Sequence, residues 1–147
     1  MIRIAVISDT HDWMPPGLPA RLAGADEIWH LGDVCEPHTL AELDRLGKPL
    51  HVVLGNNECH SLWPEERWLE RAGRKFFLTH IPPARAPAGA EFVLHGHTHV
   101  PRDETDERGV RWLNPGCISR PRQGSRSGFA WLLLEKNQPI DWRLETL

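Results

Sequence analysis

Three histidines at alternate positions follow a short apolar segment, and their type and spacing suit metal binding. The segment covers residues 92–94, and the histidines are His95, His97 and His99. Alternate residues of a strand share a face, so these imidazoles would converge on one point if the extended backbone continues. Histidine is the commonest metal ligand, whereas a half-buried strand with solvated histidines is the alternative for this segment alone.

Polar residues of the same chemical kind follow four earlier apolar segments. Residues 2–7, 27–31, 50–54 and 75–78 are short and rich in apolar or β-branched side chains, which predicts buried strands. The ligand-type residues that follow all these segments are Asp9, His11, Asp33, Asn56, His80, His97 and His99. In open α/β sheets, binding sites gather beyond the carboxyl ends of the strands. We therefore expect these side chains to meet at one rim of the fold.

The composition of this set indicates two metal ions rather than one. One catalytic zinc usually has three protein ligands, whereas two-metal hydrolytic sites hold ions about 3.5–4 Å apart. Carboxylate, amide and imidazole ligands without a thiolate favour Mn²⁺, Fe, Zn²⁺ or Ni²⁺. Two carboxylates leave two divalent ions a formal surplus of about two positive charges, which a bridging hydroxide would reduce to about one. Such a site attracts anions and polarises phosphoryl oxygens, so phosphoester hydrolysis is the expected reaction.

The overall composition is typical of one globular domain spanning residues 1–147. Of the 147 residues, 40% are hydrophobic and 25% are charged, and the net charge of -3 argues against a general polyanion binder. The three widely spaced cysteines contain no CxxC pair, which indicates a reducing compartment. The N-terminal apolar run is too short for a signal peptide or a membrane span, so we expect a cytoplasmic protein without a membrane partner.

The remaining elements suggest the fold class. Helices are expected near residues 19–23 and 39–46, and a short one after Pro64. Five further strands, four of them forming two hairpins, are expected at residues 68–71, 102–106, 110–113, 129–135 and 140–144. An early alternation of strands and helices, followed by strands alone, predicts a four-layer α/β/β/α sandwich: two mixed β-sheets flanked by helices.

The ordered motifs resemble those of the calcineurin-like metallophosphoesterases, and the resemblance covers nearly the whole chain. The motifs are Asp9-x-His11, Gly32-Asp33, Gly55-Asn56-Asn57-Glu58, Thr79-His80 and Gly96-His97-Thr98-His99. The short length, Asn114-Pro115-Gly116-Cys117 and the following Pro121-Arg122 are most similar to the small bacterial and archaeal phosphodiesterases of the YfcE type.

The resemblance implies a role for each ligand-type residue. Asp33 would bridge two ions, each held by three further side chains: Asp9, His11 and His99 for the first, and Asn56, His80 and His97 for the second. Relatives of this type are typically active with Mn²⁺, which makes manganese the expected metal. Some of them form dimers or tetramers, so a homo-oligomer is compatible with the resemblance.

One position departs from the family pattern. Many relatives have a histidine that protonates the leaving group where this chain has Asn57, whose amide cannot act as a general acid. Loss of a general acid typically lowers the rate about 10²–10⁴-fold, so aryl or activated diesters are the expected substrates. The acid stays unassigned: Asn57 would only hydrogen-bond a phosphate oxygen, and His60 and His95 are alternative candidates. Glu58 is expected to orient its neighbours, and Arg122 either contacts a substrate phosphate or is simply solvated.

Three classes of function stay open. A two-metal phosphodiesterase acting on small phosphoesters is favoured, because the chain has no room for a large specificity domain. A nuclease or a phosphomonoesterase would use the same site, although the acidic charge balance counts against nucleic acid as the partner. A non-catalytic scaffold, similar to the retromer subunit of this fold, would have degenerate ligand positions, whereas all seven are present here.

Overall fold

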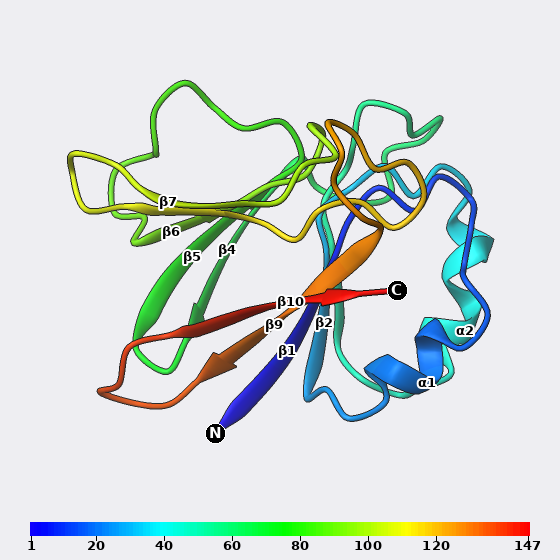
Figure 1. Ribbon diagram of the computed structural model, residues 1–147, viewed down its shortest axis with the longest axis horizontal. Helices are drawn as coiled ribbons and strands as arrows, with labels where there is room; N and C mark the ends of the chain where they lie inside the picture. The colour runs from blue at the N-terminus through cyan, green and yellow to red at the C-terminus, as the bar shows by residue number, and fades with distance from the viewer.

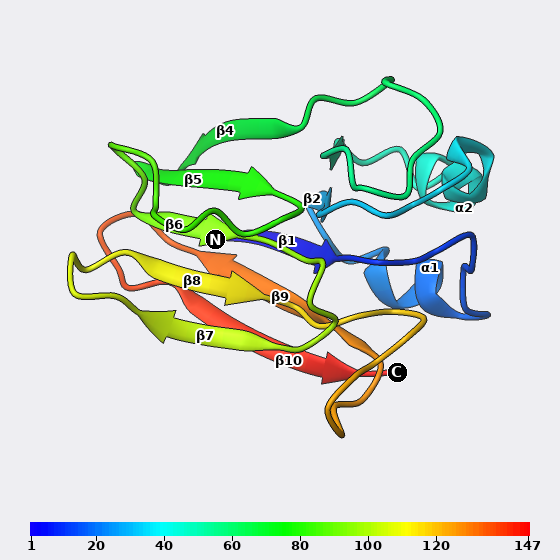
Figure 2. The same cartoon turned by 90° about the horizontal axis from the view of Figure 1, so that it is seen from above.

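In the computed structural model, which describes residues 1–147, two five-stranded sheets pack face to face (Figures 1 and 2). The first sheet has the order β10-β9-β1-β2-β3, in which β1, β2 and β3 are parallel and β9 and β10 are antiparallel additions. The bounds of its strands are Ile2–Ile7 for β1, Glu27–His30 for β2, Leu50–Val52 for β3, Gly128–Leu134 for β9 and Asp141–Thr146 for β10.

The second sheet has the order β4-β5-β6-β8-β7. Its three central strands β5, β6 and β8 are parallel, and the edge strands β4 and β7 run antiparallel to their neighbours. The bounds are Glu66–Arg71 for β4, Arg74–Thr79 for β5, Phe92–Leu94 for β6, Arg102–Thr105 for β7 and Arg111–Asn114 for β8. The predicted sandwich of two mixed sheets is therefore confirmed.

Helices cover the outer face of the first sheet only. They are α1 (Leu18–Leu22), the 3₁₀ turn η1 (Pro37–Leu40) and α2 (Ala41–Asp44), on the side of β1 and β2 away from the second sheet in Figure 1. The outer face of the second sheet is instead covered by the loop of residues 81–91, under which Phe77 and Trp112 lie buried. None of the helices has the length and apolar character needed to cross a membrane.

The helix predicted after Pro64 is wrong, because strand β4 begins two residues later. Side chains of β4 alternate between exposed and half-buried, and the half-buried Leu69 packs against the core between the sheets. That period of two is the pattern of a strand with one wet face. Pro64 therefore precedes a strand and does not begin a helix.

The core between the sheets aligns their carboxyl ends. Ile4 and Val6 of β1 face Phe76 and Leu78 of β5 in one buried cluster. The alternate residues Ala5 and Ile7 pack instead beneath the helices, so β1 is buried on both faces, as its apolar run predicts. In Figure 2 the arrowheads of β1, β5 and β8 point the same way, so the loops that follow these strands meet at one rim.

Candidate metal centre

The loops at this rim hold their polar side chains with an unusual backbone. Five of the seven predicted ligands have positive φ angles: Asp9 (57°), His11 (45°), Asp33 (59°), His97 (70°) and His99 (62°). Left-handed backbone at non-glycine residues costs about 1–3 kcal/mol each and persists only where the surrounding structure imposes it. The loops therefore store strain at the residues whose side chains they direct.

Two glycines let the loops approach one another closely. A Cβ atom on Gly96 would clash with Ser8 Oγ, and one on Gly55 would clash with the backbone nitrogen of Asp33. The backbone of Gly96 also donates to the carbonyl of His80, and the backbone of His97 donates to Asp9 Oδ2 (3.2 Å). Glycine is thus required where the rim loops of the two sheets cross.

Carboxylate oxygens and imidazole nitrogens of five residues converge in a buried cluster. His99 Nε2 lies 3.2 Å from Asp9 Oδ1 and 3.4 Å from His11 Nε2. His11 Nε2 in turn lies 3.6 Å from Asp33 Oδ2. His80 Nε2 is 3.3 Å from Asp33 Oδ2 and 3.8 Å from Asp9 Oδ1. One ligand atom from each of Asp9, His11, Asp33 and His99 lies within 4.8 Å of the others. This arrangement offers a cation a compact set of oxygen and nitrogen ligands.

Backbone carbonyls orient two of the imidazoles. His80 Nδ1 donates to the carbonyl of Leu31 (2.7 Å), and His99 Nδ1 donates to the carbonyl of Arg120 (2.6 Å). In both rings Nε2, the atom that faces the carboxylates, is left with a lone pair, as in a histidine that ligates a metal. His80 Nε2 and Asp9 Oδ1 are buried without any hydrogen-bond partner. Two orphaned polar atoms that face each other in this way fit a cation between them.

The charges in the cluster keep Asp33 ionised. Burial alone would raise the pKa of Asp33, but the neighbouring His80 and two hydrogen bonds from Asn57 hold that pKa well below its ordinary range. Burial would lower the pKa of His80, yet the neighbouring carboxylates of Asp33 and Asp9 raise it. Both shifts have one cause, because the buried carboxylates favour positive charge beside them.

Burial outweighs the carboxylates at His11. It lowers the pKa of this imidazole, although Asp33 and Asp9 oppose the shift. A neutral imidazole keeps the lone pair that metal ligation requires. His11 therefore faces the cluster in the protonation state of a ligand.

Asn56 and His97 lie at the mouth of the cluster. His97 Nδ1 is 3.0 Å from Asn56 Oδ1, and the ring of His97 is 5.2 Å from that of His80. Asn56 is exposed and His97 is half-buried, whereas His80 is almost completely buried. The structure thus brings the seven predicted ligands together: five lie inside the cluster, and Asn56 and His97 lie at its mouth.

The two residues after Asn56 hold the loop of Asp33 in place. Asn57 donates its backbone N–H to Asp33 Oδ1 (3.0 Å) and its side-chain amide to Asp33 Oδ2 (2.8 Å). Glu58 accepts from the backbone nitrogens of Asp33 (3.2 Å), Cys35 (2.9 Å) and Gly55. Asn57 therefore orients the carboxylate, and Glu58 joins the loops that follow β2 and β3.

The other candidate residues lie apart from this cluster. His95 is buried, its Nδ1 lies against the carbonyl of Gly96, and its Nε2 accepts from Arg102 Nη1 (3.1 Å). Burial lowers the pKa of His95 to about 4, so the ring is neutral near pH 7 and is poorly suited to donate a proton. His60 packs against Trp63 with ring centroids 4.8 Å apart, and the exposed Arg122 side chain makes no hydrogen bond.

Several groups that support the candidate metal centre were not identified as site residues from the sequence. The carbonyls of Leu31 and Arg120 have no signature in the sequence, because every residue has a carbonyl. Ser119 Oγ donates to the carbonyl of Asp9 (2.8 Å) from a loop distant in the chain. Asn114 ends β8 and donates to the carbonyl of Gly96 (3.2 Å) and to Thr98 Oγ1 (3.1 Å). Asn114 follows an apolar segment, as the predicted ligands do, so its position in the sequence is the signal that could have identified it.

Comparison with known proteins identifies the family. The model of the calcineurin-like phosphoesterase superfamily domain matches residues 2–137. The chain belongs to this superfamily. Members of the superfamily are metal-dependent, and the cluster of Asp9, His11, Asp33 and His99 could hold a metal ion. No curated protein matches the chain.

Solved structures share the fold of this calcineurin-like phosphoesterase. YfcE, a phosphoesterase from E. coli, is 22% identical with a TM-score of 0.75, covering 89% of this chain and 88% of YfcE. Vps29 of Entamoeba histolytica, solved with Zn²⁺, is 19% identical with a TM-score of 0.77, covering 97% of each chain. A Thermotoga maritima protein, TM1076, is 26% identical with a TM-score of 0.76 over the full length of both chains.

Proposed function

We propose that this calcineurin-like phosphoesterase is a metal-dependent phosphodiesterase for small phosphodiesters with good leaving groups. The observation that carries the proposal is the pair of buried, unpartnered atoms Asp9 Oδ1 and His80 Nε2, which lie 3.8 Å apart. A buried polar group without a partner costs about 1–3 kcal/mol, a cost that a bound cation removes. Such an arrangement serves a cation-dependent reaction better than it serves stability.

The ligand assignment follows the resemblance to the family, and the convergence of Asp9, His11, Asp33 and His99 supports it. Asp33 would be shared by two divalent ions, of which Asp9, His11 and His99 would hold the first, and Asn56, His80 and His97 would hold the second. When bound, such ions attract the phosphoester, polarise its phosphoryl oxygen and lower the pKa of water. All donors are oxygen or imidazole nitrogen, which suits Mn²⁺, with Fe, Zn²⁺ and Ni²⁺ as alternatives. The thiol of Cys35 faces His11 Nδ1 (3.9 Å), not the Nε2 atom in the cluster.

The leaving-group preference follows from Asn57. Its side-chain amide is committed to Asp33 Oδ2 and has no proton that it could transfer to a leaving alkoxide. His95, the alternative acid, is neutral and accepts a hydrogen bond from Arg102. Substrates whose leaving groups depart without protonation, such as aryl diesters, are therefore favoured.

The proposed substrate is a small phosphoester, and the proposed location is a reducing compartment. The net charge of -3 supports a small phosphoester over nucleic acid as the partner. The preference for diesters over monoesters is supported by the resemblance to small phosphodiesterases of the YfcE type. The free thiols of Cys35, Cys59 and Cys117 support a cytoplasmic location.

The test is a comparison of three substrates with Mn²⁺ present. We expect kcat/KM for bis(p-nitrophenyl) phosphate to exceed that for p-nitrophenyl phosphate by about tenfold or more, and that for single-stranded DNA to be lower than for both. Asp33→Asn should lower the diesterase activity by at least about 10²-fold. A higher kcat/KM for the monoester would contradict the proposed diester preference, and efficient cleavage of the DNA would favour a nuclease.

A non-catalytic scaffold is the second candidate. The observation that favours it is a set of exposed apolar side chains in loops at the rim, namely Trp13, Leu62 and Ile81. Large apolar side chains that are exposed can serve as contacts for a protein partner. Retention of ions without hydrolysis of any of the three substrates would favour the scaffold over the phosphodiesterase.

A further inference from the structure

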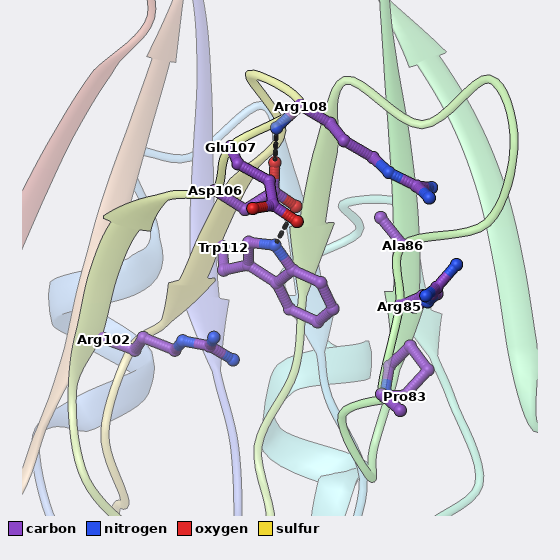
Figure 3. A pocket seen from close by; sticks show the side chains of 9 residues that line it. Pro83, Arg85, Ala86, Arg102, Asp106, Glu107, Arg108 and Trp112 are labelled. Atoms are coloured by element: carbon purple, nitrogen blue, oxygen red, sulfur yellow. Dashed lines mark hydrogen bonds between the residues drawn. The ribbon is translucent and has the colours of Figure 1, made fainter.

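A pocket of about 390 Å³ lies on the outer face of the second sheet (Figure 3), and none of the predicted metal ligands lines it. The loop of residues 81–91 forms one wall, and β7, β8 and the turn between them form the others. Three arginines and a tryptophan dominate its lining: Arg85, Arg102, Arg108 and Trp112. The volume suits a small molecule rather than a macromolecule.

The floor of the pocket is held rigidly. Trp112 is 4% exposed, and its indole Nε1 donates to Asp106 Oδ2 (2.9 Å). The Arg102 guanidinium lies over the indole at 4.6 Å from the ring centroid, donates to Glu104 and donates to His95 Nε2. The charge of Arg102 is therefore paired, and its position is defined by three contacts.

Two other arginines have no such partners. The side chains of Arg85 and Arg108 make no hydrogen bond or ion pair, and both line the pocket. Figure 3 shows both of them on the side of Ala86, across the pocket from Arg102. Two uncompensated guanidinium groups that share one small pocket favour an anion there.

The carboxylates of the pocket form no ion pair with Arg85 or Arg108. Asp106 Oδ1 accepts from the backbone nitrogens of Arg108 (2.9 Å) and Val110 (3.0 Å), and its Oδ2 accepts from the indole of Trp112. These three hydrogen bonds hold the Asp106 carboxylate at the turn between β7 and β8. Glu107, the other carboxylate in the lining, is exposed and forms no ion pair, so Arg85 and Arg108 have no ion-pair partner in the pocket.

We propose that this pocket binds a small molecule bearing a phosphate group, held between Arg85 and Arg108. Each guanidinium presents five N–H donors in a planar fork that matches the oxygens of a phosphate, and a dianion satisfies both charges at once. Pro82, Pro83 and Pro87 restrict the loop that carries Arg85, which lowers the entropy lost on binding. The inference stands on this pocket alone and does not depend on the proposed function.

The test is a titration of the full chain, as purified, with inorganic phosphate at constant ionic strength. The indole N–H resonance of Trp112, assigned with Trp112→Phe, reports on the pocket by NMR and is insensitive to phosphate bound only at the metal centre. We expect this resonance to shift saturably with phosphate, and Arg85→Gln and Arg108→Gln each to weaken the apparent affinity about tenfold. Both substitutions are at exposed positions without side-chain contacts, so the fold should be retained.

The matched control removes two charges elsewhere. Arg45→Gln combined with Lys48→Gln lies near the end of α2, where neither side chain has an ion pair, and should leave the phosphate titration unchanged. No saturable shift of the Trp112 resonance would overturn the proposal, and so would equal weakening by the control. An acetate titration that saturates more tightly than phosphate would overturn the assignment of the ligand class.

Discussion

A single side chain, Asn57, connects the chemistry of this site with its architecture. The residue type alone predicts the absence of a general acid. The structure adds a second role, because the Asn57 amide donates to Asp33 Oδ2 and its backbone donates to Asp33 Oδ1. No pattern in the sequence shows that contact, since it depends on how the loop after β3 folds back over the loop after β2.

Truncation of this side chain should weaken metal binding. Asn57→Ala removes a hydrogen bond that orients Asp33, and loss of such a supporting contact typically costs 10–100-fold in metal affinity, so we expect a drop of about tenfold or more for Mn²⁺. Isothermal titration calorimetry with Mn²⁺ measures the change. Gln138→Ala, an amide truncation in the turn between β9 and β10, is the control. Equal affinities for Asn57→Ala and this control would show that Asn57 does not position Asp33.

His30 gives the fold a dependence on pH that is separate from the metal ligands. The ring is fully buried, its Nδ1 accepts from the backbone of Gly32, and its Nε2 contacts Thr10 Oγ1 at 3.0 Å. Burial lowers the pKa of His30 from 6.5 to about 3. In the unfolded chain His30 binds a proton near pH 6.5, whereas in the folded chain it binds one only near pH 3. The free energy of unfolding therefore decreases as the pH falls through this range.

The expected loss from His30 between pH 7.5 and pH 5.5 is about 1.4 kcal/mol of unfolding free energy. Urea unfolding in the presence of EDTA at the two pH values measures the total loss, to which other groups contribute. His30→Gln removes the titrating group, so the loss in this variant should be smaller by that amount. An identical pH dependence in the variant and the original chain would contradict a buried neutral His30.

At the scale of elements, strands were predictable where burial fixes the pattern. The apolar runs that become β1, β2, β5 and β6 are buried and were identified from composition alone. The helix expected after Pro64 failed because a proline marks a boundary that is compatible with either a helix or a strand after it. Cross-sheet contacts have no local signal either: Arg71 of β4 donates from Nε and Nη2 to the carboxylate of Glu27 at the start of β2 (2.6 and 3.1 Å).

The crossing of the rim loops makes Gly96 intolerant of any side chain. A Cβ atom there meets Ser8 Oγ and, at 2.8 Å, Asp9 Oδ2, so Gly96→Ala forces the loops of the two sheets apart. We expect a loss of about 1–3 kcal/mol of unfolding free energy, measured by urea denaturation, together with weaker Mn²⁺ binding. Gly24→Ala is the matched control, because its Cβ meets only Arg3 Nη1 at 3.7 Å. Comparable stability of the two variants would mean that the rim loops yield easily.

At the scale of the whole molecule, the sequence was informative about the two-sheet architecture and about which residues meet at the rim, and silent about the order of the strands. Ligand-type residues after five apolar runs predicted a shared rim, because parallel strands end on one side. The order of the strands within each sheet lies outside such patterns, since it depends on packing between segments far apart in the chain. The pocket of Arg85 and Arg108 was unpredictable for the same reason, as it needs the loop of residues 81–91 to lie over β8.

The most direct test of the metal centre is a crystal structure of the chain with Mn²⁺, with anomalous scattering used to locate the ions. We predict two manganese peaks about 3.5–4 Å apart, with Asp33 between them. Asp9, His11 and His99 should surround one peak, and Asn56, His80 and His97 should surround the other. No peak, or peaks away from Asp33, would contradict the account, and a single peak would contradict the two-ion assignment.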